Sequence, residues 1–210
     1  MLTIHGLHIS SNTTKLLYVA EELGLDYVFV DLDFMKGEHK TPEHMARHPL
    51  GKAPTLTHEG KTLFESSAIC RYLASVEKSE LYPVANPYQC GQIDQWMAFF
   101  TSHLGRATNS YAFEKVAKVK YGFGTPNNEA MEAALGEIKT QMPMLDAHLA
   151  SNDFLVGQTL TIADCYAFAY MENAELADFP LSEYPNVLRW YSEMRERPAT
   201  SRAWKKLGRK

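Results

Sequence analysis

The spacing of hydrophobic and polar positions changes near residue 76. Before this point, residues 1–5 and 27–32 alternate or are β-branched and predict strands, and the helical spacing of residues 16–23 predicts a helix that ends at Gly24. Residues 55–57 and 62–64 flank Glu59-Gly60 and predict a hairpin, followed by a helix with an apolar face from Ile69 to Val76. With a short helix near residues 42–48, the order is βαβ-α-ββα, which predicts a small α/β domain.

The rest of the chain has helical spacing almost throughout. Residues 77–86 lose this spacing, are bracketed by Pro83 and Pro87, and predict a linker. Helices are predicted over residues 88–120, 127–150, 162–176, 184–196 and 201–207. We therefore expect an α/β domain over residues 1–76, a linker over residues 77–86 and an all-α helical bundle domain over residues 87–210.

Composition narrows the range of partners. The chain has 210 residues, of which 45% are hydrophobic, so it can bury real cores. Its net charge of −4, without a run of five like charges, argues against a nucleic-acid or membrane-surface partner. No signal peptide and no apolar window long enough for a membrane span are found, so we expect a cytoplasmic protein.

Three cysteines, Cys70, Cys90 and Cys165, are odd in number and widely spaced. This spacing argues against a disulfide framework, a structural zinc site or a dithiol redox centre. His44 and His48 have the i,i+4 spacing of helical metal ligands, but no third ligand is near, and we expect no metal.

The segment "GKAPTL" at residues 51–56 places Pro54 at the start of a predicted strand, although proline cannot donate to a sheet ladder. One interpretation is that Pro54 simply opens an edge strand. The other is that Ala53 leaves its backbone groups unpaired, so that an extended ligand can bind them as a strand partner.

Glu65 and Ser66 open a predicted helix directly after a strand. Free backbone N–H groups, the Ser66 hydroxyl and the helix dipole suit a carboxylate, and the Glu65 side chain suits an ammonium group. A γ-glutamyl group carries both charges. The alternative is that Ser66 only caps its helix.

Thr161 and Asp164 fit a capping box, so we assign Asp164 to folding rather than to catalysis.

This order of elements, with a proline at the third strand and helices behind it, resembles the cytosolic glutathione transferases, and the nearest class is phi or phi-like. The motifs that carry the resemblance are "GLHISSNTTK", "GEHK", "GKAPTL", "LFESSAICRYLA" and "LVGQTLTIADCYAFA". The resemblance implies a thioredoxin-like first domain that binds glutathione as co-substrate, and a homodimer. Residues 72–78 and 88–94 are the faces we expect to pair.

The resemblance also implies roles for individual residues. In the phi class a catalytic serine follows G-x-x-x-S, which points from Gly6 to Ser10, with Ser11 as the adjacent competitor. We expect the Ser11 hydroxyl to cap the helix that continues into Asn12. The proline equivalent to Pro54 is cis in the family, and the residue before it, here Ala53, bonds the cysteinyl backbone of glutathione. The other residues implied to bind glutathione are Glu65 and Ser66 at its γ-glutamyl end, and His39, Lys40 and Lys52 at its glycine carboxylate; Lys52 stands where the family usually has glutamine.

The hydrophobic substrate site is expected in a cleft between the two domains. Most aromatic residues of the second domain are expected in its core. Tyr111 and Phe113, with Ile9 and Met35 from the first domain, are our candidates for the lining of this site.

The sequence thus predicts an enzyme that conjugates the glutathione thiolate to small apolar electrophiles, with reduction of hydroperoxides as a further activity to test. Two alternatives stay open. A glutathione-dependent thiol-disulfide reductase normally has cysteine at the position of Ser10. A non-catalytic ligand carrier or interaction scaffold shares the same fold.

Overall fold

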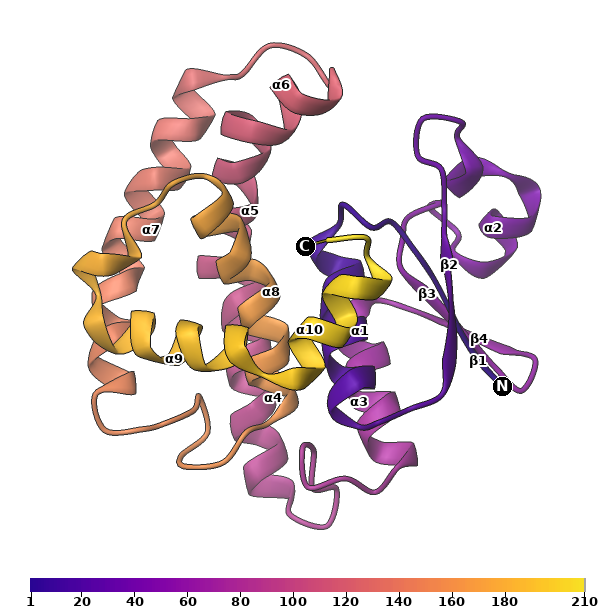
Figure 1. Ribbon diagram of the computed structural model, residues 1–210, viewed down its shortest axis with the longest axis horizontal. Coiled ribbons are helices and arrows are strands. Elements are labelled where there is room, and N and C mark those ends of the chain that lie inside the picture. Colours follow the sequence, from indigo (N-terminus) through magenta and orange to yellow (C-terminus); the bar gives the residue numbers. More distant parts are fainter. Residues whose placement is uncertain (210) are drawn as a thin grey trace. The chain divides into compact units, whose positions relative to one another are not determined.

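The computed structural model describes residues 1–209, and the chain forms two compact units in it. One unit contains Met1–Ala85 together with the segment from Glu196 onward, and the other contains Asn86–Arg195. The four strands of the sheet belong to the first unit, and helices build the second (Figure 1).

The first unit confirms the predicted βαβ-α-ββα order. Its elements are β1 (Leu2–Gly6), α1 (Ser11–Glu22), β2 (Tyr27–Asp31), a 3-10 turn η1 (Glu38–Lys40), α2 (Pro42–Arg47), β3 (Thr55–His58), β4 (Lys61–Phe64) and α3 (Ser66–Val76). The sheet order is β2-β1-β3-β4, with β1 parallel to β2 and antiparallel to β3, and β3 antiparallel to β4. This arrangement is a thioredoxin-like fold.

The core of the first unit lies where α1 packs against α3. Leu16 and Leu17 of α1 and Ile69 of α3 are fully buried, as are Ile4 and Leu56 of the sheet. These are the positions that the helical and alternating patterns mark as apolar, so burial of one stripe per element explains the fold.

The second unit is a helical bundle. It contains α4 (Pro87–Ser102), α5 (Leu104–Ala112), a π-helical turn η2 (Phe113–Ala117), α6 (Lys118–Tyr121), α7 (Asn128–Leu149), α8 (Ile162–Leu176), a 3-10 turn η3 (Leu181–Glu183) and α9 (Pro185–Glu196). Every residue of α8 from Ile162 to Met171 is buried, so α8 is the central helix of the bundle. Within residues 1–209, no helix combines the length and the apolar content that crossing a bilayer requires.

The single helix predicted over residues 88–120 is wrong. The chain leaves helical geometry at His103, with φ −125° and ψ −104°, and starts again at Leu104. Gly105 lies so close to α8 that an added Cβ would approach the Tyr170 ring to 2.5 Å. The break thus sits beside a close helix contact that only glycine permits.

The last helix, α10 (Pro198–Lys206), also differs from expectation, because the sequence assigns all of residues 87–210 to the second domain. Its contacts place α10 on the first unit, against α1. Arg197 pairs with Glu22, and the Trp204 indole donates to the Tyr18 hydroxyl at 2.7 Å. The polar side chains of α1 therefore hold the C-terminal helix.

Candidate functional site

Strand register brings three predicted site segments to one end of the sheet. β1 ends at Gly6, β3 begins at Thr55 opposite His5, and β4 ends at Phe64 opposite Thr55. Each candidate segment lies within four residues of one of these strand ends. They are Ser10 after β1, Ala53-Pro54 before β3, and Glu65-Ser66 after β4.

Ser10 occupies the N-cap position of α1, with extended backbone angles. Its carbonyl accepts the first helical bonds from Thr13 and Thr14, but its side chain makes no capping bond. A serine at this position normally uses its hydroxyl as the cap. The hydroxyl of Ser10 therefore stays available to a ligand, at the positive end of the α1 dipole.

Ser11 is the first residue of α1 and is buried. The sequence favours the Ser11 hydroxyl as the cap of this helix, and that expectation is wrong, because Ser10 holds the N-cap position. The carbonyl of the N-cap residue must begin the helical bonds, and only Ser10 has the extended geometry for this.

The loop that carries Ser10 is held by neighbours on both sides. The backbone N–H of Leu7 donates to the Thr13 hydroxyl at 2.9 Å, and that of His8 donates to Asp31 at 2.9 Å. An added Cβ on Gly6 would lie 2.4 Å from the Thr13 methyl, so only glycine lets β1 approach α1 so closely. Ser10 is thus fixed relative to the end of the sheet.

The Ala53-Pro54 peptide bond is cis. The residue before Ala53 is anchored from α2, because the Nε2 of His44 lies 2.8 Å from the Lys52 carbonyl. A carbonyl only accepts, so Nε2 carries the proton. His44 is fully buried, and its ring therefore fixes the loop that presents Ala53.

Glu65 is exposed at the N-cap of α3, and its backbone has φ 71° and ψ 110°. This left-handed φ is strained for a residue other than glycine, typically by about 1–3 kcal/mol, and such strain is found at functional sites. Ser66 is the first helical residue and not the N-cap, so the interpretation of Ser66 as a simple helix cap fails.

His39 and Lys40 form η1 and lie against the same loop. An added Cβ on Gly51 would contact the His39 carbonyl and the Lys40 side chain. The Lys40 ammonium donates to the Leu50 carbonyl at 2.8 Å and has further protons for a ligand. The His39 ring stacks on Phe34, and burial lowers the pKa of His39, so this ring is neutral near pH 7.

The four candidates for the apolar substrate site are divided between the units. In the first unit, Met35 is 77% exposed in the loop after β2, and Ile9 is half-buried beside Ser10. In the second unit, Phe113 is 40% exposed and stacks on Phe123, whereas Tyr111 is only 8% exposed. Tyr111 thus offers much less surface than the other three.

Asp164 is fully buried and accepts from the backbone N–H groups of Leu155 and Thr161, the Thr161 hydroxyl and the Trp190 indole. The predicted capping box is therefore present. Burial raises the pKa of Asp164, while these donors act in the opposite direction.

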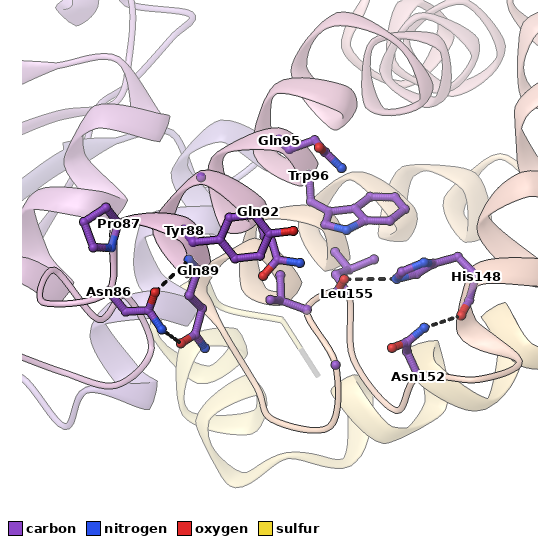
Figure 2. Close-up of a pocket in the computed structure, with 13 residues that line it drawn as sticks. Asn86, Pro87, Tyr88, Gln89, Gln92, Gln95, Trp96, His148, Asn152 and Leu155 are labelled. Carbon is purple, nitrogen blue, oxygen red and sulfur yellow. Dashed lines mark hydrogen bonds between the residues drawn. The ribbon is translucent and has the colours of Figure 1, made fainter.

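The second unit has a hollow of its own, with a volume of about 710 Å³. Figure 2 shows it between side chains of α4, such as Gln92 and Trp96, and those of the segment after α7. The Trp96 and His148 rings lie 4.6 Å apart, and the His148 ring bonds the Leu155 carbonyl. None of the predicted site residues lines this hollow.

Sequence reasoning missed the residues that support the site from a distance. It weighed His44 only as a metal ligand, whereas its ring anchors the Lys52 carbonyl. Within residues 1–209, no three His, Cys, Asp or Glu side chains are grouped to hold a metal. Arg209 donates to the His8 carbonyl, although 201 positions separate the two residues in the sequence. A local sequence pattern could not show this contact. Asp31 could have been found from the sequence, because it is a carboxylate at the end of β2, and β2 ends beside the end of β1.

Comparisons with known proteins agree with this arrangement. The model of the glutathione S-transferase N-terminal domain matches residues 2–75, and that of the C-terminal domain matches residues 96–198. A probable glutathione S-transferase of rice, GSTF2 of Oryza sativa subsp. japonica, is 30% identical over 203 residues, which are 96% of this chain and 94% of the relative.

Two further proteins bear on function. A solved structure of glutathione S-transferase I from maize, in complex with an atrazine glutathione conjugate, is 30% identical with a TM-score of 0.88 and covers 99% of this chain and 98% of its own. Elongation factor 1-gamma of Prunus avium is 31% identical over 202 residues, which are 94% of this chain but only 46% of that protein. The two domain models and the full-length relatives show that this chain belongs to the glutathione S-transferase family, as a phi-like member.

Proposed function

We propose that this enzyme transfers glutathione, through its sulfur, to small apolar electrophiles. Glutathione is the co-substrate, and its thiolate is the nucleophile. The observation that carries the proposal is the Ser10 hydroxyl, which lies at the start of α1 and is not used as the helix cap. The complex of the maize relative with a glutathione conjugate supports the same reaction for this chain.

The energetics of thiol ionisation fit this role. A thiol with a pKa of about 8.5 is only a few per cent ionised at pH 7. Lowering that pKa by about two units requires roughly 2.7 kcal/mol of preferential stabilisation of the thiolate. A hydrogen bond from Ser10 to a charged sulfur contributes about 1.5–3 kcal/mol, and the α1 N-terminus about 0.3–1 kcal/mol.

The rest of the tripeptide is bound by the neighbouring segments. Glu65 pairs with the γ-glutamyl ammonium, and Ser66 with the carboxylate beside it, at the start of α3. The Ala53 backbone pairs with the cysteinyl residue as a strand would. His39, Lys40 and Lys52 bind the glycine carboxylate; Lys40 and Lys52 supply charge, and the neutral His39 ring donates a hydrogen bond.

The apolar substrate contacts Ile9 and Met35 of the first unit and Phe113 and Tyr111 of the second. Among these, Met35 and Phe113 supply most of the accessible apolar surface. Aryl halides, isothiocyanates and organic hydroperoxides are the electrophile classes to test. A panel of glutathione-dependent turnover assays with one substrate of each class measures which of them the enzyme accepts.

Replacing Ser10 with alanine should raise the pKa of the bound glutathione thiol by at least about one unit, because the thiolate loses its hydroxyl donor. Turnover at pH 6.5 should fall about fivefold, in step with the ionised fraction of a thiol whose pKa rises from about 6.5 to about 7.5. Glutathione affinity should stay within a few-fold, since other segments bind the tripeptide. Ultraviolet absorbance of the thiolate, titrated with glutathione bound, measures this pKa directly.

Ser11→Ala is the control for this experiment, because Ser11 is the next residue and lies inside α1. If Ser11→Ala raises the thiol pKa and Ser10→Ala does not, the catalytic serine is Ser11. If neither variant changes it, a backbone N–H at the start of α1 activates the thiol and the serine assignment is wrong.

A second candidate function is that of a non-catalytic interaction scaffold, and the similarity to elongation factor 1-gamma favours it. Absence of turnover with every substrate class, with glutathione binding retained, would support the scaffold.

A thiol-disulfide reductase is distinguished by the Ser10→Cys variant. If the parent already reduces a mixed disulfide as fast as this variant, the reductase function holds.

We further propose that the enzyme is a two-fold homodimer, paired through residues 72–78 and 88–94. Val76 is 45% exposed and Tyr88 is 78% exposed, which leaves apolar surface on both segments. Sedimentation at micromolar concentration should give a mass near twice 23.8 kDa. A mass of one chain under these conditions would contradict the dimer.

The compartment we propose is the cytoplasm. Within residues 1–209, Cys70, Cys90 and Cys165 form no disulfide, which suits a reducing environment.

A further inference from the structure

The C-terminal helix α10 is fixed along α1. Trp204 donates to the Tyr18 hydroxyl at 2.7 Å, and the Arg202 guanidinium donates to the Glu21 carboxylate at 2.8 Å and carbonyl at 2.7 Å. Figure 1 shows α10 beside α1, with the segment that follows α10 returning toward the start of α1. The residues after α10 therefore leave from a fixed point.

The backbone after α10 is equally defined. Gly208 has φ 67°, and its N–H donates to the Lys205 carbonyl, while the N–H of Arg209 donates to the Trp204 carbonyl at 2.9 Å. This pair of bonds around a left-handed glycine is a Schellman motif. It ends the helix and turns the chain, so the backbone of Arg209 is held in place.

The Arg209 side chain reaches the loop that carries Ser10. Its Nη2 donates to the His8 carbonyl and to the Thr14 hydroxyl, both at 3.1 Å. The Thr14 hydroxyl in turn donates to the Ser10 carbonyl at 3.1 Å. The guanidinium thus bridges the residues on both sides of Ser10, and its positive charge lies two hydrogen bonds from that residue.

The other ionisable groups near the start of α1, Lys15, His8 and Asp31, do not supply a comparable positive charge. Lys15 is fully buried with its ammonium 2.6 Å from the Asn12 side chain, and burial lowers the pKa of Lys15 well below its usual value. His8 is paired with Asp31, whose carboxylate opposes a thiolate. An arginine stays charged at every pH at which the enzyme works.

We propose that Arg209 is a positioning residue for the glutathione thiolate, because it clamps the His8–Thr14 segment around Ser10 and places a permanent positive charge beside it. This inference rests on the proposed function of Ser10. The segment after α10 then becomes part of the glutathione site through Arg209, without contact between Arg209 and the reacting atoms.

The Arg209→Gln variant tests this proposal, since glutamine retains donors but removes the charge. The pKa of the bound glutathione thiol should rise by about half a unit, the size expected for one charge acting through largely aqueous surroundings. Turnover at pH 6.5 should fall about twofold, in step with the ionised fraction, and should return to the parent value well above the thiol pKa. High salt should shrink the difference between the variant and the parent.

Lys205→Gln is the matched control, because it removes the same charge from an exposed position in α10, four residues before Arg209. It should leave the thiol pKa within about 0.1 unit, whereas Arg209→Lys should restore most of the parent value. The role of this charge is overturned if Arg209→Gln leaves the pKa of the bound thiol unchanged. It is also overturned if Arg209→Lys raises that pKa as much as Arg209→Gln does. A bound thiol that titrates like free glutathione in the parent overturns the proposed function itself.

Discussion

Replacing Asp164 with alanine is expected to lower the free energy of unfolding by about 3–5 kcal/mol, the largest effect on stability that we predict. The carboxylate is fully buried and joins the segment at Leu155, the start of α8 and the Trp190 indole of α9. Its loss leaves these donors buried without a partner, at about 1–3 kcal/mol each. The shift of the urea midpoint, at an unchanged slope, measures the loss.

Asp153→Ala is the control, because Asp153 is exposed and its nearest cation, on Arg189, is 3.9 Å away. This change should alter stability by no more than about 0.5 kcal/mol. The Asp164→Ala protein that stays folded should keep the turnover number of the parent, since Asp164 has a folding role. A loss of stability below about 1 kcal/mol, or a loss of turnover without a loss of stability, would contradict this assignment.

Most of the architecture followed from hydrophobic periodicity, because each element buries one stripe of side chains. The break at His103 escaped detection for the same reason. Ile93, Met97, Phe100 and Leu104 keep helical spacing through the break, so the pattern continues where the backbone does not. The cause lies at Gly105, which has no side chain to contribute to a pattern.

The position of α10 was equally hidden. The helix itself was predicted from its spacing, but its polar partners Glu21 and Glu22 lie about 180 residues away in sequence. An ion pair across such a distance leaves no local signal, because surface arginines and glutamates are common everywhere. The contacts of Arg209 with His8 and Thr14 are of the same kind.

The candidate site was more accessible to sequence reasoning, because its segments adjoin strand ends. Motif spacing led to Ser10, and Pro54 marked the start of a strand. The assignment of the α1 cap to Ser11 was wrong because sequence shows which residues cap well, but not where the extended backbone ends. The left-handed backbone of Glu65 was not predictable at all, since glutamate rarely adopts it.

Replacing Glu65 with alanine should weaken glutathione binding by about ten- to over a hundred-fold, the largest effect on binding that we predict. The γ-glutamyl ammonium then loses a charge-assisted hydrogen bond worth about 1.5–3 kcal/mol. Ser66→Ala should weaken binding less, because the backbone N–H groups at the start of α3 still face the carboxylate. Titration calorimetry with glutathione measures both dissociation constants.

Glu59 supplies a matched control, because it is an exposed glutamate that also has a left-handed backbone, with φ 50°. Glu59→Ala carries the same change of residue and a similar backbone demand, yet it should leave glutathione affinity unchanged. Glu65→Gly separates strain from binding. Glycine relieves the strained φ of 71° at this position, so the variant should be at least as stable as Glu65→Ala while binding glutathione equally poorly. Unchanged glutathione affinity in Glu65→Ala would show that the γ-glutamyl group binds elsewhere, and affinity regained in Glu65→Gly would show that backbone geometry, not the carboxylate, governs binding.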